Sequence, residues 1–221
     1  MKCNTTLMLA ALMSSASLAA ERAIVVPATV QMSWEFVTPG TGARLRPHLG
    51  VGFWQRSSGA KPGVGANYVS ALEYQLPEAA PARVRSTSIQ FSGRSSQCVG
   101  AEPVVIEVSA YPADGRADVA DAHAGSRVAQ LSAQCGDNAA FARPIDVTAI
   151  VRQLSVPAGV RYVGFNIRKA NNRQGPGLFE LSPGKLTVVL ADEAMAQGAR
   201  SRPPAPAVAA QQTTLKIRTA P

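Results

Sequence analysis

The chain has 221 residues, 46% of them hydrophobic, and a formal net charge of +8 at neutral pH. This composition fits a globular domain and excludes an intrinsically disordered chain. The positive charge favours anionic partners, such as acidic polysaccharide, cell-wall polymer or an outer-membrane surface. The Arg and Lys residues are scattered, and no helix or RNA-binding motif organises them, so the sequence predicts no nucleic-acid binding.

Residues 1–20 have the pattern of a secretory signal peptide: a lysine near the start, an apolar stretch, and small residues before Glu21. The apolar stretch is shorter than the roughly 20 residues that span a bilayer, and no later segment is long and uncharged enough to do so. We therefore predict no transmembrane segment. We expect cleavage after Ala19 or Ala20 and an exported product that is periplasmic, secreted or held at the cell surface. An uncleaved anchor is the alternative.

Three cysteines are present, and Cys3 would leave with the signal peptide. Cys98 and Cys135 then remain in a compartment where disulfides persist, so the sequence predicts a disulfide between them. Closing that loop would stabilise the fold by roughly 3 to 4 kcal/mol. Two separate buried thiols are the alternative.

Short runs of alternating apolar residues, separated by Gly, Pro, Ser and Asp, extend from residue 23 to residue 190 and are typical of strands joined by turns. Each run has one apolar and one more polar face. We therefore predict an all-β fold for residues 21–192, an antiparallel β-sandwich of the jelly-roll type. Pro27 interrupts the first run and indicates an edge strand or a bulge. The clearest runs are 69–76, 86–91, 104–110, 163–167 and 186–190.

One segment changes to helical spacing. Apolar residues recur at that spacing from Val147 to Leu154, directly after Asp146, a good N-cap residue. The pattern predicts one short helix of about two turns that ends before Pro157. Its apolar stripe would cover the open edge of the sandwich.

The composition changes after residue 192. Residues 193–221 are rich in Ala, Gln, Arg and Pro, which predicts a solvated linker and a C-terminal tail. Within the tail, Leu215 and Ile217 alternate with polar residues over 213–219. This segment is either a frayed end or a last strand, which could add to a sheet edge of the domain itself or of a protein partner.

Several of these segments resemble a pattern in exported bacterial proteins, in which an Asp-Val-Thr strand end leads through a short helix to a strand containing Gly-Phe. Residues 71–190 thereby resemble the DNRLRE-type, carbohydrate-binding-module-like β-sandwiches. The resemblance implies a jelly roll that serves as an accessory domain or as a small stand-alone surface protein. The family's namesake motif is absent, and the region up to Arg56 does not match. The segments that carry the resemblance are 71–77, 82–91, 141–148, 159–168 and 186–190.

No catalytic constellation is visible in the sequence. Two histidines, His48 and His123, are present, and neither lies in a nucleophile-elbow, zinc-binding or Walker motif. We therefore predict a protein that is not an enzyme. Glycosidases need only two carboxylates, which can come from distant strands, so Glu35, Glu73 and Glu107 leave a secreted hydrolase open. We expect Glu73 and Glu107 to be solvated on the polar faces of their strands.

Trp54 is the most informative aromatic residue. It alternates with Phe53 and shares the less apolar face of its run with Arg56. An exposed Trp beside a cation is a platform on which a sugar ring can stack, with the Arg as a directed donor. The alternative is that Trp54 packs under the loop 57–67. Tyr111 is a second candidate ligand-binding residue.

Asp114, Asp118 and Asp121 lie in one loop, and oxygen-rich loops can bind calcium. Their spacing departs from that of an EF-hand, and Arg116 would offset part of their charge, so a plain surface turn is the alternative. Apart from this structural calcium, no cofactor is predicted.

These observations predict an exported, non-catalytic protein that binds cell-surface or extracellular polysaccharide through Trp54, Arg56 and Tyr111. A structural or assembly subunit of a periplasmic or surface complex is the alternative, and a secreted hydrolase is the third possibility.

Overall fold

The computed structural model describes residues 21–38, 42–55, 65–79, 81–98, 102–116, 118–136, 139–154, 160–170 and 177–191. The predicted signal peptide, the C-terminal linker and the segment 213–219 lie outside these ranges, as does Arg56. None of the helices in the described ranges is long and apolar enough to span a membrane.

The described residues form eleven strands that belong to one sheet, and every pairing between them is antiparallel. The prediction of an antiparallel all-β fold is confirmed. The strands are β1 (Glu21–Pro27), β2 (Val30–Thr38), β3 (Ala43–Arg46), β4 (Gly50–Gln55), β5 (Gly65–Gln75), β6 (Val84–Cys98), β7 (Val104–Ala113), β8 (Ser126–Ala133), β9 (Ile145–Asp146), β10 (Tyr162–Lys169) and β11 (Gly177–Ala191). The helices are α1 (Ala139–Ala142), α2 (Thr148–Leu154) and the 3-10 helices η1 (Pro81–Arg83) and η2 (Val119–His123).

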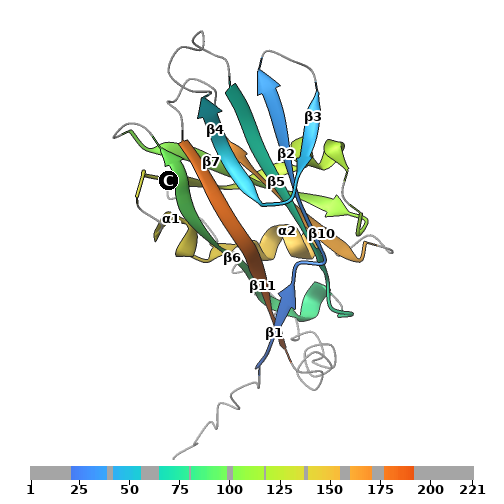
Figure 1. Cartoon of the computed structure of the whole chain (residues 1–221). Helices are drawn as coiled ribbons and strands as arrows, with labels where there is room; N and C mark the ends of the chain where they lie inside the picture. Colours follow the sequence, from blue (N-terminus) through green and yellow to red (C-terminus); the bar gives the residue numbers. More distant parts are fainter. Residues whose placement is uncertain are drawn as a thin grey trace, which may run out of the picture.

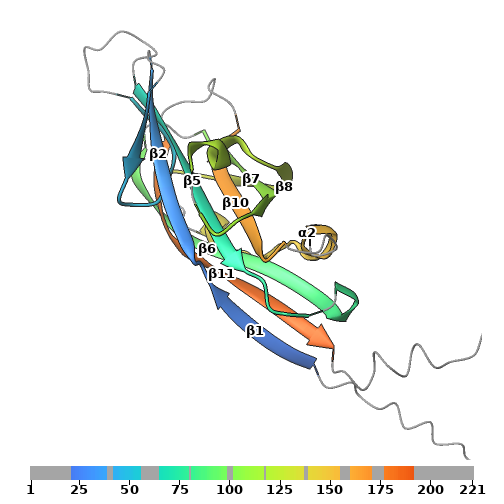
Figure 2. The same ribbon diagram turned by 90° about the vertical axis from the view of Figure 1, so that its right-hand side faces the viewer.

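The long strand β5 is the branch point of the sheet. One of its edges pairs with β2, and the other pairs first with β4 and then with β10. From β5, one part of the sheet continues through β10, β7 and β8, and the other through β4, β11, β6 and β9. β3 extends the sheet beyond β2, and β1 pairs with β11. The sheet therefore curls into two layers (Figures 1 and 2).

The hydrophobic core lies between these layers. Leu72 and Phe165 come from one layer and Ile89 and Leu186 from the other, and all four are fully buried in one cluster. They occupy the alternating positions that the sequence pattern predicted to face inward. Phe165 also meets Tyr74 edge to face, with 5.9 Å between ring centroids. The strand prediction is confirmed for these runs.

The helix α2 closes one side of the core. Its side chain Val151 is buried, as is Val147 just before it, and the helix packs against β6 (Figure 2). Asp146 Oδ1 accepts hydrogen bonds from the hydroxyl of Thr148 at 2.6 Å and from its backbone N–H at 2.9 Å, and both hold the pKa of Asp146 below its ordinary value. The predicted helix is confirmed, whereas α1 is a second helix that the spacing did not predict.

Two smaller predictions concern Pro27 and the cysteines. Pro27 ends β1, which pairs with β11 at the sheet edge, as the sequence indicated. Cys135 is disulfide-bonded. The backbone N–H of Gly136 donates to Ser95 Oγ at 3.1 Å, which places Cys135 beside the end of β6 that carries Cys98. The side chain of Cys98 is outside the described part, so its pairing with Cys135 stays a prediction.

Candidate binding cavity

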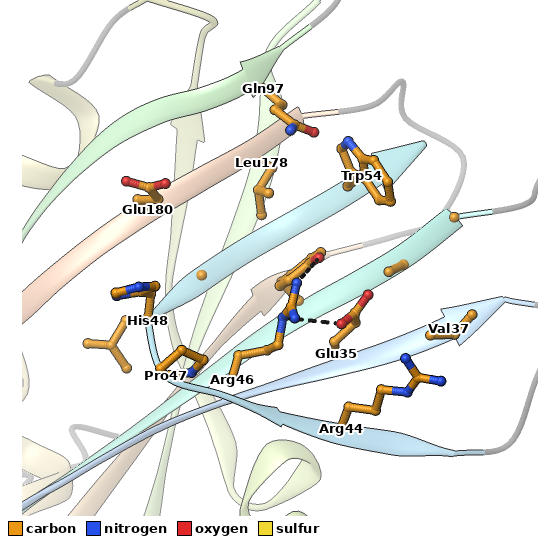
Figure 3. A pocket seen from close by; sticks show the side chains of 15 residues that line it. Glu35, Val37, Arg44, Arg46, Pro47, His48, Trp54, Gln97, Leu178 and Glu180 are labelled. Atoms are coloured by element: carbon orange, nitrogen blue, oxygen red, sulfur yellow. Dashed lines mark hydrogen bonds and ion pairs between the residues drawn. The ribbon is translucent and has the colours of Figure 1, made fainter. Parts of the chain in front are cut away.

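One face of the sheet carries a row of side chains across five strands. Strand pairing sets Arg44 opposite Glu35, Glu35 opposite Tyr68, Tyr68 opposite Gly52, and Gly52 opposite Leu178. Directly paired residues point to the same face, so this row lies on one surface. These residues, Gly52 excepted, line a cavity of about 620 Å³ (Figure 3).

Trp54 belongs to the next row of the same face, beside Ala66 and Val37. Its side chain is half-buried and stands at one end of the cavity (Figure 3). Val51 lies on the opposite face of β4, because it is an odd number of positions away from Trp54, and it is fully buried in the core. The prediction that Trp54 lies on the less apolar face of its strand is confirmed.

The other end of the cavity is closed by residues 46–50, which connect β3 to β4 and cross β2 and β5 on this face (Figure 3). Under the crossing, β2 and β5 carry Ser33 and Ser70, both fully buried. Gly50 N–H donates to Ser70 Oγ at 2.9 Å, and Ser70 Oγ donates to Gly50 O at 2.8 Å. Small hydroxyl side chains thus make room for the crossing and satisfy its buried backbone groups, which would otherwise be costly.

Two glycines of β4 are required for different reasons. A Cβ at Gly50 would lie 3.4 Å from Tyr68 Cδ1 and 3.7 Å from Leu178 Cδ1, so a larger side chain there would occupy the cavity. At Gly52 the backbone conformation, and not the space in the cavity, requires glycine. It has a φ of 124°, and a Cβ would lie 1.9 Å from the carbonyl oxygen of Gly177.

Arg46 is held in place on the cavity wall. Its Nε lies 3.1 Å from Glu35 Oε2, and its Nη2 donates to the hydroxyl of Tyr68 at 3.4 Å. The guanidinium carbon lies 5.8 Å from the centre of the Tyr68 ring. The hydrogen bond to Tyr68, and to a smaller extent the charge of Glu35, raise the pKa of Arg46. The charges of Arg46 and Glu35 therefore largely compensate each other.

The described lining carries two guanidinium groups, Arg44 and Arg46, and two carboxylates, Glu35 and Glu180, so a positive excess arises only through Arg94, which lies outside this lining. Glu180 is paired with Arg94, with 2.6 Å between Oε2 and Nη2. Arg44 is exposed and has no ion-pair partner within the described ranges. With Glu180 paired from outside, the described lining combines an apolar floor with the guanidinium of Arg44, which has no carboxylate partner among the described residues, an arrangement suited to an anionic ligand.

The prediction that Tyr111 binds ligand is wrong, because Tyr111 is only 2% exposed. Its hydroxyl donates to Glu73 Oε1 at 3.3 Å, and the backbone N–H of Gly115 donates to Glu73 Oε2 at 2.9 Å.

The prediction that Glu73 is solvated is also wrong, because Glu73 is 1% exposed. The connection between β7 and β8, which contains η2, covers this face of the sheet. Burial is the main cause that raises the pKa of Glu73 to about 7, and the charge of Asp121 adds to it.

The three aspartates of the predicted calcium loop serve local turns. Asp114 Oδ1 accepts from the backbone N–H of Arg116 at 2.9 Å. Asp118 Oδ1 accepts from Ala120 N–H at 2.6 Å, and Asp121 Oδ2 from Asp118 N–H at 2.8 Å, which caps η2 at its N-terminus. Nowhere in the described part do three His, Cys, Asp or Glu residues come together as metal ligands. The calcium prediction therefore has no support.

The other two glutamates considered for hydrolysis have partners of their own. Glu35 is paired with Arg46 in the cavity. Glu107 Oε1 accepts from Gln130 and Arg127 at 3.2 and 3.3 Å, and its Oε2 lies 3.4 Å from Arg168. These donors outweigh the burial of Glu107 and lower its pKa. In the described part, no hydrogen bond joins any two of the three glutamates.

Sequence reasoning found Trp54 but missed Arg44, Arg46 and Tyr68. A signal for the two arginines exists, because the alternation Arg44-Leu45-Arg46 places both on one face of a strand. No such signal shows that this face adjoins Trp54, since that depends on the pairing of β2, β4 and β5.

The chain matches no protein-family model, and no curated protein is significantly similar to it. The resemblance to DNRLRE-type domains stays a prediction.

Proposed function

We propose that this protein is exported and binds polysaccharide, without catalysing a reaction, in the cavity that Trp54 lines. The observation that carries the proposal is the half-buried indole of Trp54 in one concave site with Tyr68 and Arg44. Its volume, about 620 Å³, falls in the range typical of small-molecule sites.

The chemistry of the lining suits a sugar ring. Such a ring has an apolar face of C–H groups and a rim of hydroxyls. Trp54 offers a large apolar surface for the face, and the guanidinium groups and Glu35 offer directed donors and acceptors for the rim. The uncompensated Arg44 favours a glycan with acidic groups, whose attraction weakens as salt screens it.

Two observations support export. Residues 1–20 have the signal-peptide pattern, and Cys135 is disulfide-bonded, which is typical of proteins in oxidising compartments.

Trp54→Ala is expected to weaken binding of a soluble acidic glycan, such as a polyuronate, by roughly tenfold or more, because a large aromatic contact surface is lost. The free energy of unfolding is expected to change little, since the indole is partly solvated and lies outside the core. Isothermal titration calorimetry measures the first effect and chemical unfolding the second.

The chain supplies a matched control in Trp34, which is 4% exposed and packs against Val69 and Ala71 on the opposite face of β2. Trp34→Phe is expected to keep the affinity of the wild type. The proposal fails if Trp54→Ala binds as well as Trp34→Phe, or if the wild type binds no acidic glycan.

A further inference from the structure

A second cavity, of about 340 Å³, adjoins the first. The two cavities share four wall residues, of which Pro47, His48 and Leu49 belong to the segment that crosses β2 and β5 and the fourth is Glu180. The residues that line only the second cavity are Gln31, Arg94, Leu181 and Pro183.

The two cavities follow each other along the strands. β2 contributes Glu35 to the first and Gln31 to the second, and Ser33 between them lies under the crossing segment. β11 shows the same order, with Leu178 in the first, Glu180 in both and Leu181 in the second. The crossing segment therefore separates two hollows of one elongated depression.

The first hollow is longer than a single sugar unit. Along β4, the four residue steps from Trp54 to Gly50 span about 13 Å at roughly 3.3 Å each, which is longer than a pyranose ring. Figure 3 shows Trp54 at one end and His48 and Glu180 at the other, where the second hollow begins. A ligand that fills the first hollow therefore ends against the shared wall.

The second hollow carries its own cation. Arg94 donates to Glu180 Oε2 through Nε at 2.9 Å and through Nη2 at 2.6 Å. The two side chains are 75% and 45% exposed, so solvent screens the pair. Arg94 donates one N–H of Nε and one of Nη2 to Glu180, and its remaining N–H groups can bind a ligand carboxylate while the pair stays in place. The amide of Gln31 can donate to and accept from sugar hydroxyls.

We propose, on the basis of the proposed function, that the two hollows are subsites for successive units of a linear acidic polysaccharide. The chain passes over Pro47–Leu49. Arg44 binds the acidic group of a unit in the first subsite beside Trp54, and Arg94 binds that of a unit in the second. The protein is thus selective for polyanionic chains over single acidic sugars.

The test is a calorimetric series of oligouronides from one to six units, measured with the wild type, Arg94→Ala and Arg127→Ala. Arg127 is the matched control, an exposed arginine paired with a carboxylate, Glu107, outside both cavities. We expect the affinity of the wild type to rise at least tenfold once the oligomer reaches the second subsite. Arg94→Ala should abolish this rise with length, and Arg127→Ala should behave as the wild type.

An affinity that does not depend on length, or a rise that survives in Arg94→Ala, overturns the two-subsite arrangement and leaves the binding function in place. Absence of binding at every length overturns the function itself. Thermal unfolding of Arg94→Ala is the control for its fold, and its midpoint should match that of the wild type because the Arg94 side chain is 75% exposed.

Discussion

Replacing Gly164 with alanine is expected to lower the free energy of unfolding by about 2–6 kcal/mol. Strand pairing places Gly164 between Glu73 and Tyr111 in one row across β5, β10 and β7. Because Gly164 has no side chain, the ring of Tyr111 lies across it and its hydroxyl reaches Glu73. A Cβ at this position would lie 2.2 Å from Tyr111 Cζ, and Tyr111 is buried, so its ring cannot move without disturbing its neighbours.

Two costs contribute to that figure. Displacing a buried ring by overpacking costs about 1–3 kcal/mol, and leaving the buried Glu73 without its hydroxyl donor costs about 1–3 kcal/mol. Urea unfolding of Gly164→Ala measures the sum. Gly42→Ala is the control, because a Cβ there meets no atom within 4 Å. A loss below 1 kcal/mol in Gly164→Ala would mean that the Tyr111 ring does not lie over this glycine.

The second large effect is on the pH dependence of stability. The pKa of Glu73 is raised to about 7 in the folded protein, against an ordinary value of 4.5. Between these two pH values the folded state keeps a proton that the unfolded state has lost, so the free energy of unfolding falls as pH rises. The expected loss from pH 4.5 to pH 8 is about 3 kcal/mol, because a pKa that differs by one between the folded and unfolded states changes the stability by roughly 1.4 kcal/mol. The Asp121 carboxyl, whose pKa is also raised, acts in the same direction.

Glu73→Gln is expected to flatten this dependence and to be more stable than the wild type at pH 8, because the amide is neutral and still pairs with Gly115 and Tyr111. Unfolding curves at several pH values between 4.5 and 8 provide the measurement. Glu107→Gln is the matched control. It should keep the slope in this window, because the pKa of Glu107 is lowered rather than raised. An unchanged slope in Glu73→Gln would show that Glu73 ionises freely.

The strands and the core could be predicted because their signal is local. Period-two alternation at 104–110 and 163–167 marks the buried positions of β7 and β10, and those positions are in the core. The helical spacing near Val151 likewise identified α2.

The sequence wrongly predicted that Glu73 and Tyr111 are accessible to solvent or ligand, and the reason is physical. The alternation correctly places Glu73 on the face opposite Leu72 and Tyr74, but an antiparallel sheet face is solvated only if nothing covers it. Here the connection between β7 and β8, about forty positions later in the chain, lies on that face. A contact over that distance leaves no trace in the local pattern of β5.

For a similar reason, the sequence predicted one residue of the cavity, Trp54, but not the residues that surround it. The face of Trp54 follows from residues 51–55 alone, whereas its neighbours depend on which strands pair and in what register. The crossing segment 46–50 depends on Ser33 and Ser70, which are ordinary strand residues in the sequence and become meaningful only when Gly50 lies above them.

The most direct test of the binding site uses the fluorescence of Trp54. The chain contains two tryptophans, so Trp34→Phe leaves Trp54 as the single indole. Titration of this variant with a polyuronate should change the emission of Trp54 in a saturable way, and the apparent affinity should fall as salt increases. Calorimetric binding of the same glycan without any change in Trp54 emission would contradict the account, because the ligand would then lie elsewhere.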